Sequence, residues 1–350
     1  MLIVLLLIAA VCGKTLLGTR IFLTGGIGGA DVIGLGYSAR FRLWEDLRLG
    51  NFPWWTGDLF GGYPIHAEGQ GGFLSPVTTL LFGVGPPVLA FGWLTATTLL
   101  VAAGGTCLAA RAAGVSRAGS CLAAVTVMLS GFSQAHLQHV NLLQAAAWWP
   151  WLALACQRGS GLGAGAVVGL QMLSGFPQMA YLSAAGAAVA AAAAHRRRAA
   201  RILAVAALLG LLIGAAQWLP TWHLSSTSVR SDGLSPESIW RWGYTWRDLS
   251  SFISAFPFGD PSVGMYARKA SLFWENSGDV GMLVVLLAAL GAGVWRSCRL
   301  VRGWMGLVVV GVGIALSGET ALTRGIAMAI PGFNSFQAPQ RAVWLAIFGL

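Results

Sequence analysis

The chain has 350 residues, of which 56% are hydrophobic and only 10% are charged, and its mean hydropathy is +0.70. This composition argues against a soluble globular domain and predicts a polytopic membrane protein. The net charge of +10 resides in short basic clusters between apolar blocks, so we expect no nucleic-acid partner. The five cysteines show no zinc spacing and lie outside both long polar loops, which predicts no disulfide framework.

A helix needs about 20 apolar residues to cross roughly 30 Å of hydrocarbon. Blocks of this kind are predicted at residues 1–23, 85–110, 118–135, 140–157, 163–194, 201–219, 279–295, 303–318 and from 341 onward. The first block lacks a basic n-region and a small-residue cleavage site, so we interpret it as a transmembrane helix rather than a cleaved signal peptide. Residues 1–350 are expected to form one all-α transmembrane bundle of about 9–10 spans or half-spans.

Short basic connectors separate several blocks, at residues 111–117, 158, 196–201 and 296–302. Lysine and arginine are enriched in cytoplasmic loops, which places these connectors inside. The two long polar loops, 24–84 and 220–278, then face outward together, and each contains five acidic residues. A charge in hydrocarbon costs about 2.5–3.5 kcal/mol, so acids gather where water or chemistry requires them. We therefore expect function in these two loops.

The first outer loop is predicted to contain an interfacial helix over residues 32–49. Its apolar residues recur at helical spacing, namely Ile33, Tyr37, Phe41, Trp44 and Leu47. The charged residues occupy the other faces. Residues 53–64 are too rich in turn formers for a helix and too aromatic for a free linker, which predicts an ordered loop on the headgroup layer.

Block 163–194 lies between two basic connectors and so must leave the cytoplasmic side and return to it. The sequence Gly175-Phe176-Pro177-Gln178 breaks it, which predicts two short tilted helices or a re-entrant pair. Gly165 and Gly169 form a small-xxx-small pair suited to close packing. A simple packed hairpin and a substrate-lining element both fit. The intramembrane amides are expected to hydrogen-bond between helices: Gln144, Gln171, Gln178 and Gln217.

Asp31 follows the glycine-rich residues 25–30 near the outer end of the first block. Two interpretations are open for its carboxylate. It could act as a general base on a hydroxyl at the membrane surface, or it could cap the helix predicted at 32–49. The glycines do not indicate a phosphate-binding nucleotide loop. No strand precedes them, and the lysine followed by serine or threonine that such a loop requires is missing.

Other side chains suggest binding roles. The outward arginines could hold a phosphate or contact lipid headgroups: Arg40, Arg42, Arg230, Arg241 and Arg247. Three histidines lie in or beside the outer loops, His66, His136 and His139, and the last two share a helix face. A metal would need more ligands nearby, so none is predicted. Three tryptophans are expected to form an aromatic belt, with sugar stacking as the second possibility: Trp148, Trp149 and Trp151.

Several segments taken together resemble the YfhO-type bacterial membrane proteins, which are placed with the multi-span GT-C class of glycosyltransferases. The segments are Asp31, Leu49–Trp55, Gly61–Pro64, Gln70 ahead of Leu74-Ser75-Pro76, Ser174–Gln178 with Tyr181, Gly214–Pro220 with Ser228 and Arg230, and Phe336–Arg341. They occur in family order from residue 31 to the end. The chain departs from the family pattern at Asp279, where a tyrosine is expected, and by stopping at Leu350 inside an apolar run, so we expect it to be incomplete at its C-terminus.

The resemblance implies a hexosyltransferase of the bacterial cytoplasmic (inner) membrane, which moves a sugar from a polyprenyl-phosphate donor to a cell-envelope polymer on the outer face. It favours Asp31 as the base and assigns the leaving phosphate to Arg230 and Arg341, where guanidinium groups would stabilise developing charge. The residues expected to bind substrate or membrane lipid are Arg40, Arg42, Trp54, Trp55, Tyr63, His66, Gln70, Gln178, Arg230 and Arg341. No cofactor is predicted.

The alternative from another class is a non-catalytic carrier or transporter for a lipid-linked substrate. A transporter should show an ionisable residue at the midplane, or paired broken helices in two repeated halves. This sequence has one such break and no clear repeat, which favours the enzyme.

Overall fold

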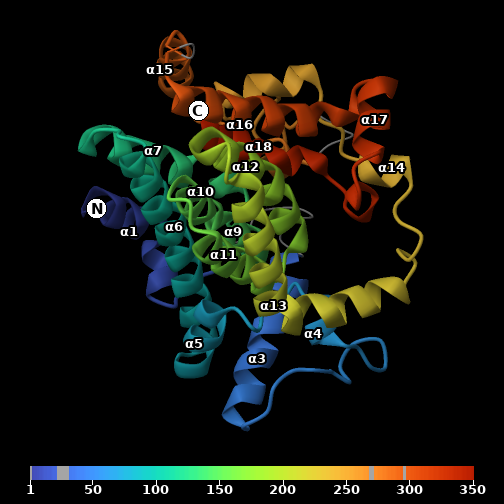
Figure 1. Ribbon diagram of the computed structural model, residues 1–350. Helices are drawn as coiled ribbons and strands as arrows, with labels where there is room; N and C mark the ends of the chain where they lie inside the picture. Colours follow the sequence, from blue (N-terminus) through green and yellow to red (C-terminus); the bar gives the residue numbers. More distant parts are fainter. Residues whose placement is uncertain (1, 22–30, 268–271, 295–296) are drawn as a thin grey trace.

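The computed structural model describes residues 2–21, 31–267, 272–294 and 297–350. These residues fold into helices joined by turns (Figure 1), and their one β-type pairing is the isolated bridge between Thr56 and Tyr63. The prediction of an all-α chain is confirmed, and the aromatic loop at residues 53–64 is ordered around that bridge.

The first half of the chain contains α1 (Leu2–Leu16), the π-helix η1 (Val32–Tyr37), α3 (Ser38–Arg48), α4 (Ile65–Glu68), α5 (Pro76–Val84), α6 (Pro87–Ala112), α7 (Arg117–Leu129), α8 (Gly131–Ala135), α9 (Val140–Ala147), α10 (Trp149–Gln157) and α11 (Gly161–Leu173). The second half contains α12 (Pro177–His195), α13 (Ala199–Ser226), α14 (Pro236–Ile239), η2 (Trp246–Phe252), η3 (Pro261–Val263), η4 (Phe273–Glu275), α15 (Met282–Ala292), α16 (Arg299–Ala315), η5 (Leu316–Gly318), α17 (Ala321–Met328), η6 (Phe333–Ser335), η7 (Pro339–Ala342) and α18 (Val343–Gly349).

Within the described ranges, four helical segments are long and apolar enough to cross a membrane. They are Pro87–Ala112, Arg117–Ala135, Ala199–Ser226 and Arg299–Gly318. Three apolar helices are shorter, α1, α11 and α15. The chain is thus a helical membrane protein, but the predicted blocks do not each form one continuous span. The block at 140–157 is divided at Trp148 into α9 and α10.

The block at 163–194 forms two helices, as predicted. The break at Gly175 has φ +83°, and a Cβ there would lie 2.0 Å from the carbonyl oxygen of Gly69, so glycine is required for both conformation and space. Pro177 then occupies the first turn of α12. In α11, Cβ atoms built on Gly165 and Gly169 would lie 2.7 Å from Leu209 and 2.5 Å from Ile213 of α13. The close packing expected of this glycine pair is confirmed.

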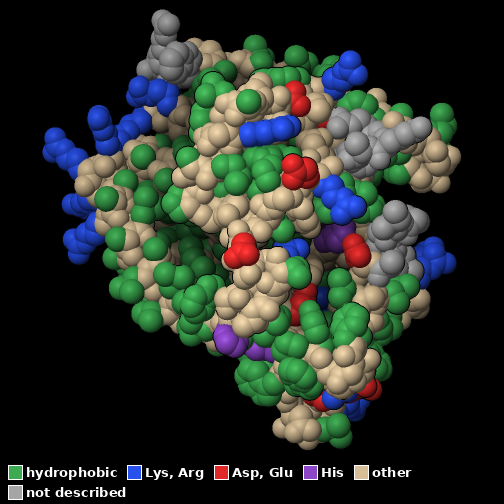
Figure 2. Space-filling view, turned by 90° about the vertical axis from the view of Figure 1, so that its right-hand side faces the viewer, with side chains coloured by type: hydrophobic (Ala, Val, Ile, Leu, Met, Phe, Trp, Pro, Cys, Tyr) green, Lys and Arg blue, Asp and Glu red, His purple; other side chains and the backbone are tan. Residues whose placement is uncertain are grey.

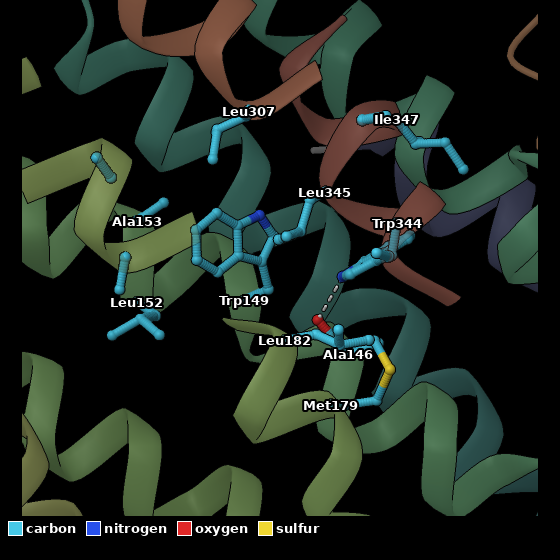
Figure 3. Packing of buried hydrophobic residues seen from close by; sticks show 14 of the residues in the cluster. Ala146, Trp149, Leu152, Ala153, Met179, Leu182, Leu307, Trp344, Leu345 and Ile347 are labelled. Atoms are coloured by element: carbon cyan, nitrogen blue, oxygen red, sulfur yellow. Dashed lines mark hydrogen bonds between the residues drawn. The ribbon is translucent and has the colours of Figure 1, made fainter. Parts of the chain in front are cut away.

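The largest core cluster joins α9, α10, α12 and α18 around two fully buried tryptophans, Trp149 and Trp344 (Figure 3). The indole N–H of Trp344 donates to the carbonyl oxygen of Ala146 at 3.0 Å. Trp149 packs edge-on against Phe348. The prediction that Trp149 belongs to an aromatic belt is therefore wrong, because a belt residue lies at headgroup level whereas this indole fills the helix bundle.

Three of the four amides predicted to lie in the membrane bond to another helix, as predicted, whereas Gln178 donates to the loop before η7. The Nε2 groups donate from Gln144 to Ser75 Oγ at 2.7 Å, from Gln171 to Ala145 O at 3.0 Å, from Gln178 to Gln337 O at 2.6 Å and from Gln217 to His66 O at 3.0 Å. These bonds replace water as partners for buried polar groups and fix which helices lie side by side.

Candidate functional site

The helix predicted at residues 32–49 is present but has two forms, the π-helix η1 followed by α3. A π-turn holds an extra residue and so rotates the residues before it relative to those after it. The buried side now includes Val32, Arg40 and Leu43, each 0% exposed, while Ile33 of the predicted apolar stripe is 54% exposed. Arg40 was expected on a charged face of this helix, and it is buried instead, together with Leu43 and Asp46 of α3.

Asp31 does not cap the helix that follows it, because its side chain makes no capping hydrogen bond. Its Oδ2 atom lies 3.7 Å from Nε2 of His139. The hydrogen-bonding interaction with His139 lowers the pKa of Asp31 and outweighs the opposing effect of partial burial. The carboxylate is therefore ionised at neutral pH. It remains 51% exposed, so a substrate hydroxyl can approach it.

His139 also contacts a second histidine in the turn between α8 and α9. The Nδ1 atoms of His136 and His139 lie 3.1 Å apart. If the Nε2–H of His139 faces Asp31, its Nδ1 accepts the Nδ1–H of His136. Nε2 of His136 is then an acceptor, and it is buried without a hydrogen-bond partner among the described residues. Burial lowers the pKa of His136 well below its ordinary value, so this ring is neutral.

The second predicted outer loop reaches the same histidines through η4. The ring of Trp274 lies 5.7 Å from that of His139, centroid to centroid. The amide of Gly131 at the start of α8 donates to the carbonyl oxygen of Asp279 at 2.7 Å. His139 thus contacts Asp31 of the first loop and Trp274 of the second, so the two loops meet at this residue.

Beyond the histidines lies a buried ion pair between Glu275 and Arg341, whose side chains are 2% and 12% exposed. Nε of Arg341 donates to Glu275 at 3.0 Å, Nη2 donates to the other carboxylate oxygen, and Nη1 donates to Oε1 of Gln178 at 2.7 Å. The guanidinium also lies 5.2 Å from the ring centroid of Phe176. All three guanidinium nitrogens of Arg341 therefore donate hydrogen bonds, and the paired bonds to the carboxylate hold the guanidinium in one orientation. We call the set Asp31, His136, His139, Gln178, Glu275 and Arg341 the Asp31 cluster.

Arg40 forms a separate buried site beside this cluster. Its Nη1 donates to the carbonyl oxygen of Gly36 at 2.7 Å, whereas Nε and Nη2 are buried without hydrogen-bond partners among the described residues. Burial lowers the pKa of Arg40 to about 10, so the group stays charged at neutral pH. Burial raises the pKa of nearby Glu68, which is held by the backbone amide of Gln70 at 2.9 Å and by its side-chain amide.

His66 and Tyr63 hold the first loop in place. Nε2–H of His66 donates to the carbonyl oxygen of Ala216 in α13 at 3.0 Å, and its ring lies 4.9 Å from that of Trp54. Tyr63 forms the bridge to Thr56. These contacts give both residues a packing role, which anchors the loop to α13.

An open cavity of about 560 Å³ lies between α3 and this loop, and it is lined by Arg42, Asp46, Gly50, Asn51, Phe52, Trp54 and Trp55. Arg42 is paired there, with Nε 2.9 Å from Asp46 and Nη1 3.1 Å from Asp58. Trp54 and Trp55 are each 59% exposed. Three residues predicted to bind substrate, Arg42, Trp54 and Trp55, are therefore brought together around one cavity.

The other predicted site residues fall into three groups. Asp31, Gln178 and Arg341 lie in the Asp31 cluster. Arg40 is buried, and Gln70 bonds to Glu68, the carboxylate that interacts with Arg40. Arg230 is exposed in the turn after α13. Sequence reasoning missed Glu275 and Trp274, and it considered His136 and His139 only as metal ligands. The described residues contain no group of three or more His, Cys, Asp or Glu that could hold a metal ion.

The fold and these clusters define a helical membrane protein with a polar site where two long loops meet. No family model matches the chain, and no curated protein or solved structure matches it.

Proposed function

We propose that the protein is a membrane-embedded glycosyltransferase that moves a sugar from a polyprenyl-phosphate donor to a cell-envelope acceptor, with Asp31 as the base. The observation that carries this proposal is the half-exposed, ionised carboxylate of Asp31, oriented by His139 at the junction of both long loops. A positioned carboxylate within reach of a hydroxyl is the minimum that acceptor activation requires.

In the proposed reaction, the acceptor hydroxyl gives its proton to Asp31 as its oxygen bonds to the anomeric carbon. The bond from that carbon to the phosphate oxygen breaks on the opposite side, so polyprenyl phosphate leaves and the configuration inverts. His139 is a positioning residue in this scheme, because its Nε2 atom lies 3.7 Å from Oδ2 of Asp31, within ion-pair range but beyond hydrogen-bond length. The ring of His136 in turn fixes the tautomer of His139.

The leaving phosphate is assigned to Arg40, which is 0% exposed in this structure, so the donor phosphate must open a path to its guanidinium. Its Nη1 donates to the carbonyl oxygen of Gly36, five residues after Asp31 in the same helical segment. The unpartnered Nε and Nη2 groups would be satisfied by phosphate oxygens. Arg341 is less suited, since its three nitrogens already bond to Glu275 and Gln178.

The cavity beside α3 is assigned to the acceptor. It combines two exposed indole rings with the carboxylate of Asp46, the amide of Asn51 and the guanidinium of Arg42. Apolar faces with a few convergent polar groups are typical of small-molecule sites, and such a set suits the hydroxyls and C–H faces of a sugar.

The test is transfer of labelled sugar from polyprenyl-phosphate donors to envelope extract by purified full-length protein in lipid vesicles. Asp31→Asn should reduce transfer by about 10²–10⁴-fold, with donor binding and thermal stability retained. Asp232→Asn, which changes an exposed aspartate of the second loop, is the matched control and should leave transfer unchanged.

Two outcomes would overturn the proposal. Full transfer by Asp31→Asn removes the base assignment. Donor binding by the parent protein without transfer to any acceptor fraction supports a carrier in place of an enzyme.

A further inference from the structure

A second charged site lies at the corner where α12 ends and α13 begins. A cavity of about 430 Å³ is lined there by Ala194, His195, Arg196, Arg197, Arg198 and Arg299. We call this set the basic pocket. The arginines come from two parts of the chain, since three belong to the corner between α12 and α13 and Arg299 is the first residue of α16.

Two hydrogen bonds fix the shape of the basic pocket. Nε2–H of His195 donates to the carbonyl oxygen of Gln157 at the end of α10, at 2.7 Å. Nη2 of Arg299 donates to the carbonyl oxygen of Ala192 in α12, at 3.1 Å. The ends of α10 and α12 and the start of α16 are thus joined around the pocket, so the cluster does not arise from one flexible loop.

The basic pocket has no internal counter-charge. The sequence contains no acidic residue between Glu68 and Asp232, or between Asp279 and Glu319. No carboxylate in the described part of the chain lies within ion-pair distance of Arg196, Arg197, Arg198 or Arg299. Like charges held together repel one another unless an anion is present. All four arginines are exposed, so an anion from outside can reach them.

Figure 2 shows the same uneven distribution over the surface, with lysine and arginine projecting along one edge of the molecule where no acidic side chains are visible, and with the acidic and histidine side chains lying over the rest of that face. Charges of one sign along an edge attract a surface of the opposite sign.

The position of the pocket along the helices indicates which anion it meets. Two of the four candidate spans, Ala199–Ser226 and Arg299–Gly318, begin at the basic pocket. Gln178 of the Asp31 cluster lies at the start of α12 and His195 at its end, which separates the two sites by roughly 26 Å at 1.5 Å per residue. That separation approaches the roughly 30 Å thickness of the hydrocarbon layer. The pocket therefore lies at the depth of lipid headgroups.

We propose that the basic pocket binds the phosphate of an anionic phospholipid headgroup, in the leaflet opposite to the one that the Asp31 cluster faces. Basic pockets between helix ends are suited to this ligand, because arginine forks match phosphate oxygens while the acyl chains lie along the flanking helices. The inference does not depend on sugar transfer.

The test uses full-length protein in nanodiscs of phosphatidylcholine with or without phosphatidylglycerol, and retained lipid is measured by native mass spectrometry. The parent protein should retain phosphatidylglycerol in preference to phosphatidylcholine. The double variant Arg197→Gln/Arg299→Gln should weaken this retention by about tenfold or more. The matched double variant Arg111→Gln/Arg117→Gln removes the same charge from another exposed connector and should retain the lipid as the parent does.

Equal losses in both double variants would show that only diffuse surface charge attracts the lipid, and would overturn the site. Displacement of the lipid by millimolar inorganic phosphate would overturn its assignment to a lipid. Thermal unfolding of each variant in phosphatidylcholine alone separates misfolding from lost binding, because a correctly folded variant keeps the parent melting temperature there.

Discussion

The Asp31 cluster and the basic pocket lie at opposite ends of α12, and they differ in how their charges are compensated. In the cluster, Asp31 faces His139 and Glu275 pairs with Arg341. In the pocket, arginines gather without a carboxylate. The cluster is organised before any ligand arrives, as expected of a site that must hold catalytic geometry, whereas the pocket acquires its counter-charge from outside.

The largest effect is expected when the cluster is made to resemble the pocket. Glu275→Gln leaves the buried guanidinium of Arg341 without its carboxylate, and breaking a buried pair in this way costs about 3–5 kcal/mol of folding stability. Thermal and denaturant unfolding in a fixed detergent measure the change. Glu237→Gln, at a fully exposed position, is the control and should leave the melting temperature unchanged.

The double variant Glu275→Met/Arg341→Met sharpens this prediction. Replacing both charges with apolar side chains of similar length should recover most of the stability, because the lone buried charge is what destabilises the single variant. A double variant as unstable as Glu275→Gln would show that packing, and not charge compensation, is responsible.

A smaller effect is expected from acid. Burial lowers the pKa of His136 below its usual 6.5, so the unfolded chain takes up a proton first as the pH falls. The stability contributed by the neutral ring is present above 6.5 and is lost below it. His139 and Arg341 face the ring and oppose a second positive charge. Asp31, whose pKa is also lowered, adds a further loss only at pH below its usual 3.8.

The melting temperature should therefore fall between about pH 7.5 and 5.5, and the fall should be smaller in His136→Asn. His223→Asn changes an exposed histidine of α13 and should keep the full pH dependence. An unchanged slope in His136→Asn would contradict the assignment.

An effect of opposite sign and smaller size is expected in the basic pocket. In zwitterionic detergent, Arg197→Gln relieves repulsion and should leave stability unchanged or raise it by less than about 0.5 kcal/mol. In phosphatidylglycerol the same variant should melt below the parent, because it has lost a lipid contact. Destabilisation in both media would show that the arginines stabilise the fold themselves.

A comparably small effect is expected at the ion pair between Arg42 and Asp58, since the aspartate side chain is 74% exposed. Asp58→Asn should cost about 0–1 kcal/mol, and the loss should vanish near 1 M salt, where screening removes the interaction in the parent as well. Unfolding at low and high salt measures both values.

The sequence predicted the features that depend on local pattern. The break at Gly175-Phe176-Pro177, the close approach at Gly165 and Gly169, and the bonding of the buried amides follow from rules about backbone and side-chain type. The prediction of a helical membrane protein follows from the length of the apolar segments. These features need no knowledge of distant partners.

The features missed depend mainly on pairings across the chain. Glu275 meets Arg341, 66 residues away, and no local signal marks that pair. The spacing of His136 and His139 was visible, but their proximity to Asp31 was not. Arg40 was assigned to a charged face of the helix over residues 32–49, although its spacing of three from Tyr37 and four from Trp44 puts it beside the apolar stripe, and the structure buries it. The glycosyltransferase activity stays a prediction.

The π-helix at Val32–Tyr37 makes chain length itself a functional constraint. A wide turn closes to an ordinary α-turn when one residue is deleted, and each residue of an α-helix turns the chain by about 100°. Losing any one of these six residues would swing Asp31 away from His139 while leaving every charged side chain in the sequence. Single-residue insertions and deletions here should therefore be counter-selected as strongly as substitution of Asp31, unlike those in the loop tips.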